Sequence, residues 1–318
     1  MMVVVAFAIV YIVWGSTYFF IRMSVAHIPP MMVGVLRFLL AGILMLLWCF
    51  FSKEKLFSWT VMRPAIISGL LLLGLGNGAL IWSEQYIPSS LAAILLAAGP
   101  IWFVLLDKGK WSENFRSKET IVGLVVGFAG VLLLFAEQLK GGLAGVQGKG
   151  GVNGAASHMG IIALVVLVLG SISWATGSLY SKYKSAGGSN AVNAGWQMLS
   201  AGIAFVPASL ISGEWASFDV AAVPMSSWIG IIYLVTMGSL VGYSAFVWLL
   251  QVRPATQVST HAYVNPVVAV LLGVFFAGET MSTLQLTGLA VILVSVLLIN
   301  LSKYRGAGSG GGRVIAAE

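Results

Sequence analysis

The chain has 318 residues, of which 59% are hydrophobic and only 8% are charged, and its formal net charge is +7. About a quarter of the residues in soluble domains are charged, so this composition excludes a soluble fold. The basic residues lie mostly in short segments between apolar runs, which argues against a nucleic-acid-binding surface.

Apolar runs long enough to cross a bilayer as helices follow one another along almost the whole chain. The runs are continuous rather than alternating and contain many Gly residues, which indicates transmembrane helices and not a β-barrel. We expect ten spans, over residues 3–21, 31–51, 65–86, 90–106, 121–136, 159–181, 191–211, 228–250, 255–277 and 284–301. The predicted fold class is therefore an all-α integral membrane protein with ten transmembrane helices.

The first span has an alternative interpretation as a cleavable signal peptide. Ser24-Val25-Ala26 resembles a small-residue cleavage site, but Met1-Met2-Val3 supplies no basic n-region. The apolar run is also longer than a normal signal-peptide core, so we expect a retained helix. Cys49 is the only cysteine, which predicts neither a disulfide framework nor a thiol site for metal or redox chemistry.

The positions of the basic residues predict the orientation of the chain. If the N-terminus is cytoplasmic, the inner loops and the tail hold nearly all the Lys and Arg residues, and the outer side holds only Lys140 and Lys149. This is the positive-inside pattern, and ten spans place both termini in the cytoplasm. Two Gly-rich segments lack periodicity, and we expect an extracytoplasmic linker at 138–158 and a flexible cytoplasmic tail at 303–318.

The segments on either side of the linker, residues 1–137 and 159–302, resemble each other. The matched pairs are Trp14 with Trp174, Arg37 with Gln197, Gly42 with Gly202, Gly76 with Gly242, Pro100 with Pro266, and Gly123 with Gly288. Because each segment holds an odd number of spans, the second copy enters the membrane from the opposite side. The sequence thus predicts two inverted five-helix repeats, a geometry suited to a carrier. A channel is the alternative, although no filter-like ring of charge or carbonyl motif is present.

Four segments carry a family resemblance: YIVWGSTYF at 11–19, VLRF at 35–38, GSISWA at 170–175 and AYVNPVVAVLLG at 262–273. With the two proline-bearing fourth helices, they resemble EamA-type carriers of the drug/metabolite transporter superfamily, in particular a YedA-like branch of the bacterial inner (plasma) membrane. The resemblance implies two inverted halves with a cavity between them, and usually export of amino acids or related metabolites.

Aromatic and polar side chains in the spans are the candidates for a substrate cavity. Trp14 and Tyr18 share one helix face, as do Trp174 and Ser178 in the other half, and these faces could form an amphipathic cavity or simply pack together. The full set of cavity candidates is Trp14, Thr17, Tyr18, Asn77, Trp82, Trp174, Ser178, Tyr243, His261 and Asn265.

Polar side chains inside a membrane are energetically costly and normally face a bundle interior or an aqueous cavity. Asn77 and Glu84 share one face of the third helix, and His261 and Asn265 share one face of the ninth. Glu84 is close to the outer interface, where a carboxylate can stay hydrated, so proton coupling is the less favoured role for it. Arg37 could neutralise a substrate carboxylate, but we favour a structural brace to helix-end carbonyls or to Glu84. His261 could titrate during transport, although a lone intramembrane His is more often a packing residue.

Pro100 and Pro266 lie near the middle of their spans and are candidate hinges. Proline has no amide hydrogen, so each leaves the carbonyl four residues earlier without its helical partner. Two such positions at matching depth could bend in turn during transport, or could fix a static kink for packing.

Enzyme and metal-binding motifs are missing from the sequence, including H-E-x-x-H, G-x-S-x-G and paired His or Cys ligands, so we expect no metal and no cofactor. We predict a secondary carrier and exporter that works by alternating access, with a membrane channel or an intramembrane enzyme as alternatives. Its expected partners are a small-molecule substrate and the lipid bilayer, with a coupling proton as an open candidate and no nucleic acid. The sequence does not distinguish a monomer from a homodimer.

Overall fold

The computed structural model describes residues 1–83, 86–87, 92, 95–134, 136, 155–185, 188–277 and 282–308, and every regular element in these residues is a helix. The longer elements are α1 (Met2–Val25), α2 (Pro30–Phe51), α3 (Trp59–Gly69) with η1 (Leu70–Asn77) and α4 (Gly78–Ser83), α6 (Gly99–Leu106), α8 (Lys118–Leu134), α10 (Ala155–Lys184), α11 (Asn190–Ile211), α13 (Met225–Tyr233) with η4 (Leu234–Tyr243) and α14 (Ser244–Val252), α16 (His261–Ala277), and α17 (Thr283–Gly308). Short helices connect them: η2 (Lys108–Lys110), α7 (Trp111–Arg116), α12 (Glu214–Ser217), η3 (Val220–Ala222) and α15 (Ala255–Val258).

Six helices in the described residues are long and apolar enough to cross a membrane: Met2–Val25, Pro30–Phe51, Trp59–Ser83, Met159–Lys184, Asn190–Ile211 and Met225–Val252. A seventh is added if Lys108–Arg116 and Lys118–Leu134, which meet at 91°, count as one bent span. Two shorter apolar helices, Leu95–Leu106 and Thr283–Ile299, and helix α16 cover the other predicted spans. The all-helical membrane fold is thus confirmed, and the count of ten spans stays a prediction.

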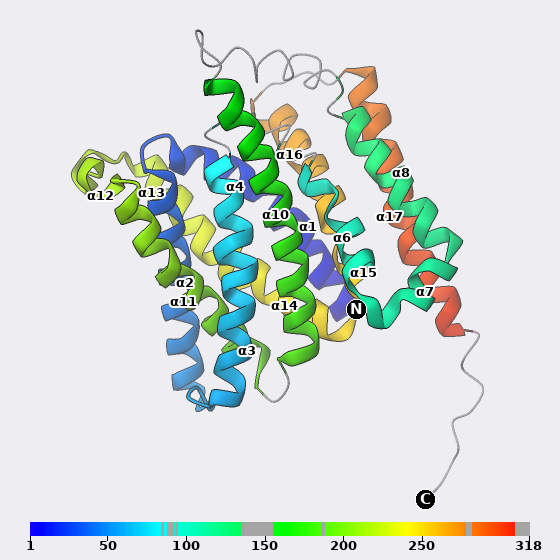
Figure 1. Ribbon diagram of the computed structural model, residues 1–318, viewed down its shortest axis with the longest axis horizontal. Coiled ribbons are helices and arrows are strands. Elements are labelled where there is room, and N and C mark those ends of the chain that lie inside the picture. The colour runs from blue at the N-terminus through cyan, green and yellow to red at the C-terminus, as the bar shows by residue number, and fades with distance from the viewer. Residues whose placement is uncertain are drawn as a thin grey trace, which may run out of the picture.

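Two helix pairs form the edges of the bundle. Figure 1 shows α2 beside α11 at one edge and α8 beside α17 at the other, with α1, α10, α14 and α16 between them. Each edge pair therefore joins the two halves of the chain, because one helix comes from residues 1–134 and the other from residues 155–308.

Glycines allow the α2–α11 pair to pack closely and reciprocally. A Cβ atom built at Gly42 would lie 2.5 Å from the Leu199 nitrogen, and one built at Gly202 would lie 2.5 Å from the Leu39 nitrogen. Side chains larger than hydrogen would force the backbones apart at both places, and small residues are typical of close helix contacts in membranes. The two crossings are related by a sequence offset of 160 residues, which is also the offset that matches Trp14 with Trp174.

Two apolar helices change their winding in the middle. The backbone opens from α-helical to π-helical winding over η1 and again over η4, and both segments are glycine-rich. Long π-helical segments are rare, and π turns occur often at functional sites because they redirect the side chains that follow. The two segments fall on matched parts of the sequence repeat, since Gly76 in η1 corresponds to Gly242 in η4.

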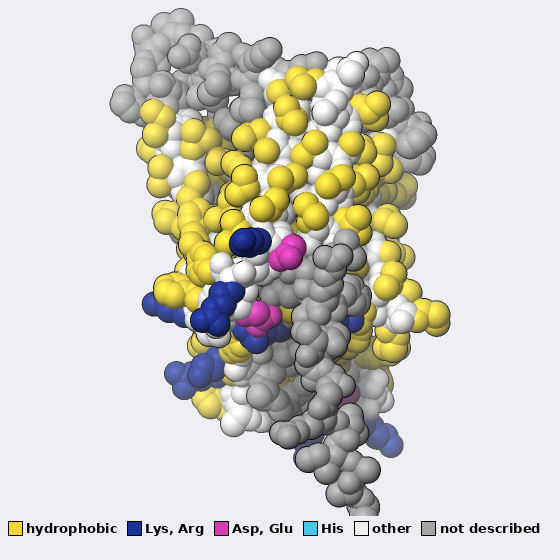
Figure 2. All heavy atoms as spheres, turned by 90° about the vertical axis from the view of Figure 1, so that its right-hand side faces the viewer, with side chains coloured by type: hydrophobic (Ala, Val, Ile, Leu, Met, Phe, Trp, Pro, Cys, Tyr) yellow, Lys and Arg dark blue, Asp and Glu magenta, His cyan; other side chains and the backbone are white. Residues whose placement is uncertain are grey.

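The surface separates into an apolar belt and a basic end. Figure 2 shows hydrophobic side chains over the upper part of one face, with the Lys and Arg side chains gathered in its lower half. On helix α2, the apolar residues Ile43, Leu44, Leu47 and Trp48 are 45–69% exposed, which is expected of a surface that faces lipid. This arrangement agrees with the sequence-based membrane assignment.

Two predicted boundaries differ from the structure. Helix α10 begins at Ala155, inside the predicted linker 138–158, and helix α17 continues to Gly308, inside the predicted tail 303–318. Helix propagation costs little once a long helix exists, so both helices extend beyond the apolar residues that predicted them. The remaining parts of the predicted linker and tail lie outside the described residues.

Candidate functional site: an aromatic cavity between the two halves of the chain

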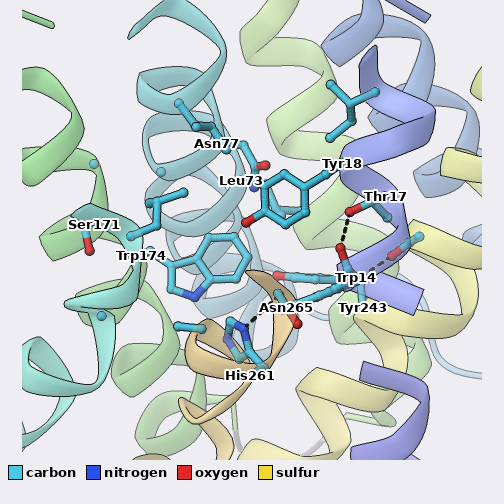
Figure 3. Close-up of a pocket in the computed structure, with 18 of the residues that line it drawn as sticks. Trp14, Thr17, Tyr18, Leu73, Asn77, Ser171, Trp174, Tyr243, His261 and Asn265 are labelled. Atoms are coloured by element: carbon cyan, nitrogen blue, oxygen red, sulfur yellow. Dashed lines mark hydrogen bonds between the residues drawn. The ribbon is translucent and has the colours of Figure 1, made fainter. Parts of the chain in front are cut away.

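A cavity of about 130 Å³ lies where helices from both halves of the chain meet. Its wall comes from α1, α2, η1, α4 and α6 in the first half and from α10, η4 and α16 in the second. The predicted site residues that line it are Trp14, Thr17, Tyr18, Arg37, Asn77, Trp174, Tyr243, His261 and Asn265. Figure 3 shows side chains from distant parts of the chain converging on this space.

Two predicted cavity residues do not line it. The Ser178 hydroxyl is fully buried and donates to the Trp174 carbonyl oxygen at 2.8 Å, so it serves its own helix. The Trp82 ring packs against Tyr86, with their centroids 4.9 Å apart. Trp82 follows η1, where the winding is π-helical and the side chains that follow are redirected.

Three other predicted positions lie apart from the cavity or outside the described residues. Pro266 is inside α16 and Pro100 is in the first turn of α6; neither lines the cavity, although their neighbours Asn265 and Gly99 do. Glu84 lies outside the described residues, so its predicted roles stay untested.

Trp14 is the centre of an aromatic cluster that forms the floor of the cavity. Its ring centroid is 4.9 Å from His261, 5.7 Å from Trp174 and 6.5 Å from Tyr243, with edge contacts to the first two and a stacked contact to the third. Phe246 lies beneath, 4.9 Å from the Trp14 ring. Aromatic pairs at these separations are attractive beyond their buried area, so these contacts stabilise the floor.

The two matched tryptophans pack on the two matched glycines, each in the opposite half. A Cβ atom at Gly242 would lie 2.8 Å from Trp14 Nε1, and one at Gly76 would lie 3.3 Å from Trp174 Cβ. Their indole nitrogens differ, however. Trp14 Nε1 donates to the carbonyl oxygen of Gly238 at 3.1 Å, whereas Trp174 Nε1 is buried with no hydrogen-bond partner.

Arg37 brings a positive charge to one side of the cavity. Its Nε donates to the Ser239 hydroxyl at 3.0 Å, and its guanidinium carbon lies 4.9 Å from the centroid of the Phe38 ring. No described carboxylate lies within ion-pair distance of Arg37. A guanidinium has five N–H donors, and the bond to Ser239 uses one of them, on a residue that lines the cavity.

His261 and Asn265 form the opposite side. Their exposures are 8% and 6%, and Asn265 Nδ2 lies 3.4 Å from His261 Nδ1. An amide nitrogen cannot accept a hydrogen bond, so in this arrangement Asn265 donates and the histidine proton is on Nε2. His261 Nε2 and Asn265 Oδ1 then remain buried without partners. An unpaired buried polar atom costs about 1–3 kcal/mol, so these atoms are arranged for a partner supplied by a ligand or by water.

Sequence reasoning missed several lining residues, including Ser171, Ser239 and Phe38. Ser239 aligns with Leu73 in the repeat, so no matched polar residue marked it, and the π-helical segment that presents it to Arg37 leaves no trace in the hydrophobic pattern. Phe38 directly follows Arg37, and that adjacency was the available signal.

Polar contacts link helices at the Lys-rich end of the bundle. The Tyr183 hydroxyl at the end of α10 donates to Asp107 Oδ1, after α6, at 2.8 Å. Lys182 donates to the carbonyl oxygens of Leu250 and, at 2.7 Å, Arg253, which satisfies the C-terminal end of α14. Among the described residues, no group of three or more His, Cys, Asp or Glu side chains could hold a metal ion.

Comparison with known proteins places the chain among transporters. Residues 1–136 and 161–301 match the sequence profile of the EamA-like transporter family. The chain is 38% identical over 297 residues to "Uncharacterized inner membrane transporter YedA" of Escherichia coli K12, with 92% of this chain and 89% of that protein covered. It is 24% identical to "Probable amino-acid metabolite efflux pump" of Salmonella typhimurium LT2, covering 93% and 94% of the two chains. A solved structure described only as "Crystal structure of protein" shares the fold, with a TM-score of 0.73, 16% identity, and coverage of 94% of this chain and 97% of that one.

Proposed function

Because the chain belongs to the EamA-like transporter family, we propose that it is a secondary carrier that exports small metabolites, amino acids or related compounds, by alternating access between two inverted five-helix halves. The observation that carries this proposal is the central cavity. It takes its wall from both halves and combines an aromatic floor with unpaired polar atoms. A cavity that is largely apolar with a few convergent polar groups is the usual form of a small-molecule site.

The reciprocal contacts support the inverted arrangement. Gly42 and Gly202 exchange equivalent contacts across α2 and α11, and Trp14 and Trp174 each pack on a glycine of the opposite half. Such exchange of equivalent contacts is what a two-fold relation between the halves requires. When two inverted halves exchange their conformations, a state open to one side of the membrane becomes an equivalent state open to the other side.

The closed floor favours a carrier over a channel. Trp14, His261 and Phe246 pack within 4.9–5.5 Å of one another, centroid to centroid, so the cavity ends on side chains rather than opening into a pore. A relative at 24% identity is named as a probable efflux pump for amino-acid metabolites, which supports the export direction and the substrate class proposed here.

Counterflow in proteoliposomes tests the carrier. Vesicles containing the purified full-length protein are loaded with one unlabelled solute, and uptake of the same labelled solute is followed across a panel of amino acids and related carboxylates. A carrier gives saturable uptake that depends on the internal solute, a channel gives flux linear in concentration, and an enzyme changes the molecule. Linear flux with unitary currents would contradict the proposal. Repeating the exchange with and without a pH gradient tests the candidate proton coupling.

Thiol labelling tests the proposed orientation, in which both termini are cytoplasmic. In a Cys49→Ser background, a cysteine at the exposed Ser112 in α7 should be shielded from an impermeant reagent in intact cells, and one at Gly148 in the Gly-rich linker should react. Labelling of the Ser112 cysteine from outside would reverse the topology.

A further inference from the structure

The two sides of the cavity are chemically unequal although the helices that build them are matched. Arg37 corresponds to Gln197 in the repeat, but the Gln197 side chain is fully buried away from the cavity. It accepts from the Tyr243 hydroxyl at 2.9 Å and donates to Ser68 and Ser181 at 2.8 and 2.9 Å. The first half therefore contributes a positively charged side chain, Arg37, to the cavity wall, and the second half contributes no side chain from the matched position.

On the opposite side of the cavity, the polar side chains of His261 and Asn265 come from the second half and not from the first. By the offset that matches Pro100 with Pro266, His261 corresponds to Leu95 and Asn265 to Gly99. The second half thus supplies His261 and Asn265 at this side, where the matched positions of the first half hold an apolar residue and a glycine.

The charged side is built for an anion. Arg37 is held by Ser239, and no carboxylate is among the described residues that line the cavity. A substrate carboxylate can take the guanidinium N–H donors that Ser239 leaves available, and charge-assisted bonds of this kind are the stronger ones. An ammonium group of a substrate would find no described carboxylate and would be repelled by Arg37.

The other side is built for an uncharged polar group. His261 Nε2 and Trp174 Nε1 can donate, Asn265 Oδ1 can accept, and all three are buried without partners. The Trp14 ring separates the two sides: its Nε1 end bonds to Gly238, next to Ser239, and its ring packs against His261 at 4.9 Å. Trp14 and Trp174 both line the cavity (Figure 3), and a planar apolar body matches aromatic walls of this kind.

We propose that the preferred substrate is a monoanionic carboxylate with a planar apolar body and an uncharged hydrogen-bonding group at the far end, and that the site discriminates against zwitterions and cations of the same shape. The carboxylate binds at Arg37 and the uncharged group at His261, Asn265 and Trp174. This inference rests on the proposed carrier function. Within its substrate class it favours related carboxylates over the amino acids themselves, which are zwitterions at neutral pH.

Three solutes of one shape and different charge test the discrimination in wild-type proteoliposomes. They are 3-phenyllactate, phenylalanine and phenylalaninamide, and the assay is run at about pH 6, where they are an anion, a zwitterion and a cation. In counterflow of labelled 3-phenyllactate, unlabelled 3-phenyllactate should compete at a concentration at least about tenfold lower than either of the others, a ratio that corresponds to about 1.4 kcal/mol. Equal competition by phenylalaninamide or phenylalanine would overturn the inference while leaving the carrier standing. If only solutes outside this set exchange, the substrate class is wrong, and if no solute in any panel exchanges, the carrier function itself is wrong.

Substitutions at the two sides separate a binding role from a structural one. Arg37→Gln, which installs the residue found at the matched position, should remove the preference for the anion, and Arg37→Lys should keep part of it. Arg116→Gln removes the same charge at an exposed site in α7 and should leave the preference unchanged. An anion preference that survives in Arg37→Gln would contradict the assignment of the carboxylate to Arg37.

The far side is tested with a para-hydroxyl group. In the wild type, 3-(4-hydroxyphenyl)lactate should compete about two- to twelvefold more strongly than 3-phenyllactate, because the hydroxyl gains a hydrogen bond. Asn265→Leu should abolish this gain and still exchange 3-phenyllactate, whose exchange reports an intact cavity. A para-hydroxyl gain that persists in Asn265→Leu, or no gain in the wild type, would overturn the assignment of the far side.

Discussion

The matched tryptophans should respond differently to the same substitution, because only one indole nitrogen has a partner. Trp→Phe keeps a planar ring and removes the N–H donor. At Trp174, which lines the cavity, the lost donor is buried without a partner, and at Trp14 it is the donor to the Gly238 carbonyl at 3.1 Å. Each variant is therefore a control for the other, because the same chemical change is made at two matched positions on the same cavity.

The expected magnitudes follow from hydrogen bonding. If the substrate accepts from Trp174 Nε1, Trp174→Phe removes one bond worth about 0.5–1.5 kcal/mol, which raises the half-saturating concentration about two- to twelvefold. Its thermal stability should be unchanged or slightly higher, because a buried unpaired donor has been removed. Trp14→Phe leaves the Gly238 carbonyl in η4 without its donor and should lower stability by about 1–3 kcal/mol. No substrate bond to the Trp14 nitrogen is expected to be lost.

Two assays on the same purified variants separate these effects. Counterflow in proteoliposomes gives the half-saturating concentration and the turnover, and thermal unfolding in detergent gives the relative stability. The expected outcome is a change mainly in affinity for Trp174→Phe and mainly in stability for Trp14→Phe. Equal effects on both measurements, or the reverse pattern, would refute the assignment of Trp174 Nε1 as a substrate donor.

Three further substitutions probe the helices around the cavity. Pro266→Ala restores an amide donor in α16 and should slow turnover while substrate binding stays nearly intact; parallel loss of both in counterflow would exclude a hinge. Gly42→Val should cost about 1–3 kcal/mol in detergent unfolding, because its Cβ would lie 2.5 Å from a backbone nitrogen of α11. Gly74→Val is its control, since the nearest atom to a Cβ there is 3.9 Å away, and equal losses would contradict the packing argument. Tyr183→Phe removes the hydroxyl that donates to the buried Asp107 carboxylate and should lower stability by about 1.5 kcal/mol at pH 7, the low end for a charged acceptor because Tyr183 is 51% exposed. An unchanged unfolding temperature would exclude that contribution.

Intramembrane polar residues were the most predictable part of the site. Asn77, His261 and Asn265 were identified because a polar side chain in hydrocarbon is costly and turns toward the interior, and all three line the cavity. The tryptophans Trp14 and Trp174 were identified from the repeat, since an inverted pair at matching depth faces the same axis. These arguments depend only on sequence position and on the low polarity of the bilayer.

The parts that could not be predicted depend on backbone winding and on competition for hydrogen bonds. The π-helical segments are as apolar as the α-helices that flank them, so no pattern showed that Ser239 would meet Arg37 or that Trp82 would turn away. Ser178 shares the face of Trp174, but its hydroxyl donates to a carbonyl oxygen of its own helix. The spacing of residues along the sequence does not predict that hydrogen bond.

The structure separates two demands on the carrier proposed here. Where α2 and α11 cross, Gly42 and Gly202 both lie against the partner backbone, so neither can gain a side chain without moving a helix. Gly99, which lines the cavity, has no such restriction. A Cβ atom at Gly99 would meet only Ala262 Cβ, at 3.8 Å, which is an ordinary contact, and the matched position holds Asn265. In the proposed alternating-access cycle, contacts that relate the two conformations have to stay alike in both halves, whereas the residues that would contact a substrate can differ. The unequal polar sides of this cavity are compatible with matched helices for that reason, and they allow a substrate to be held in one orientation.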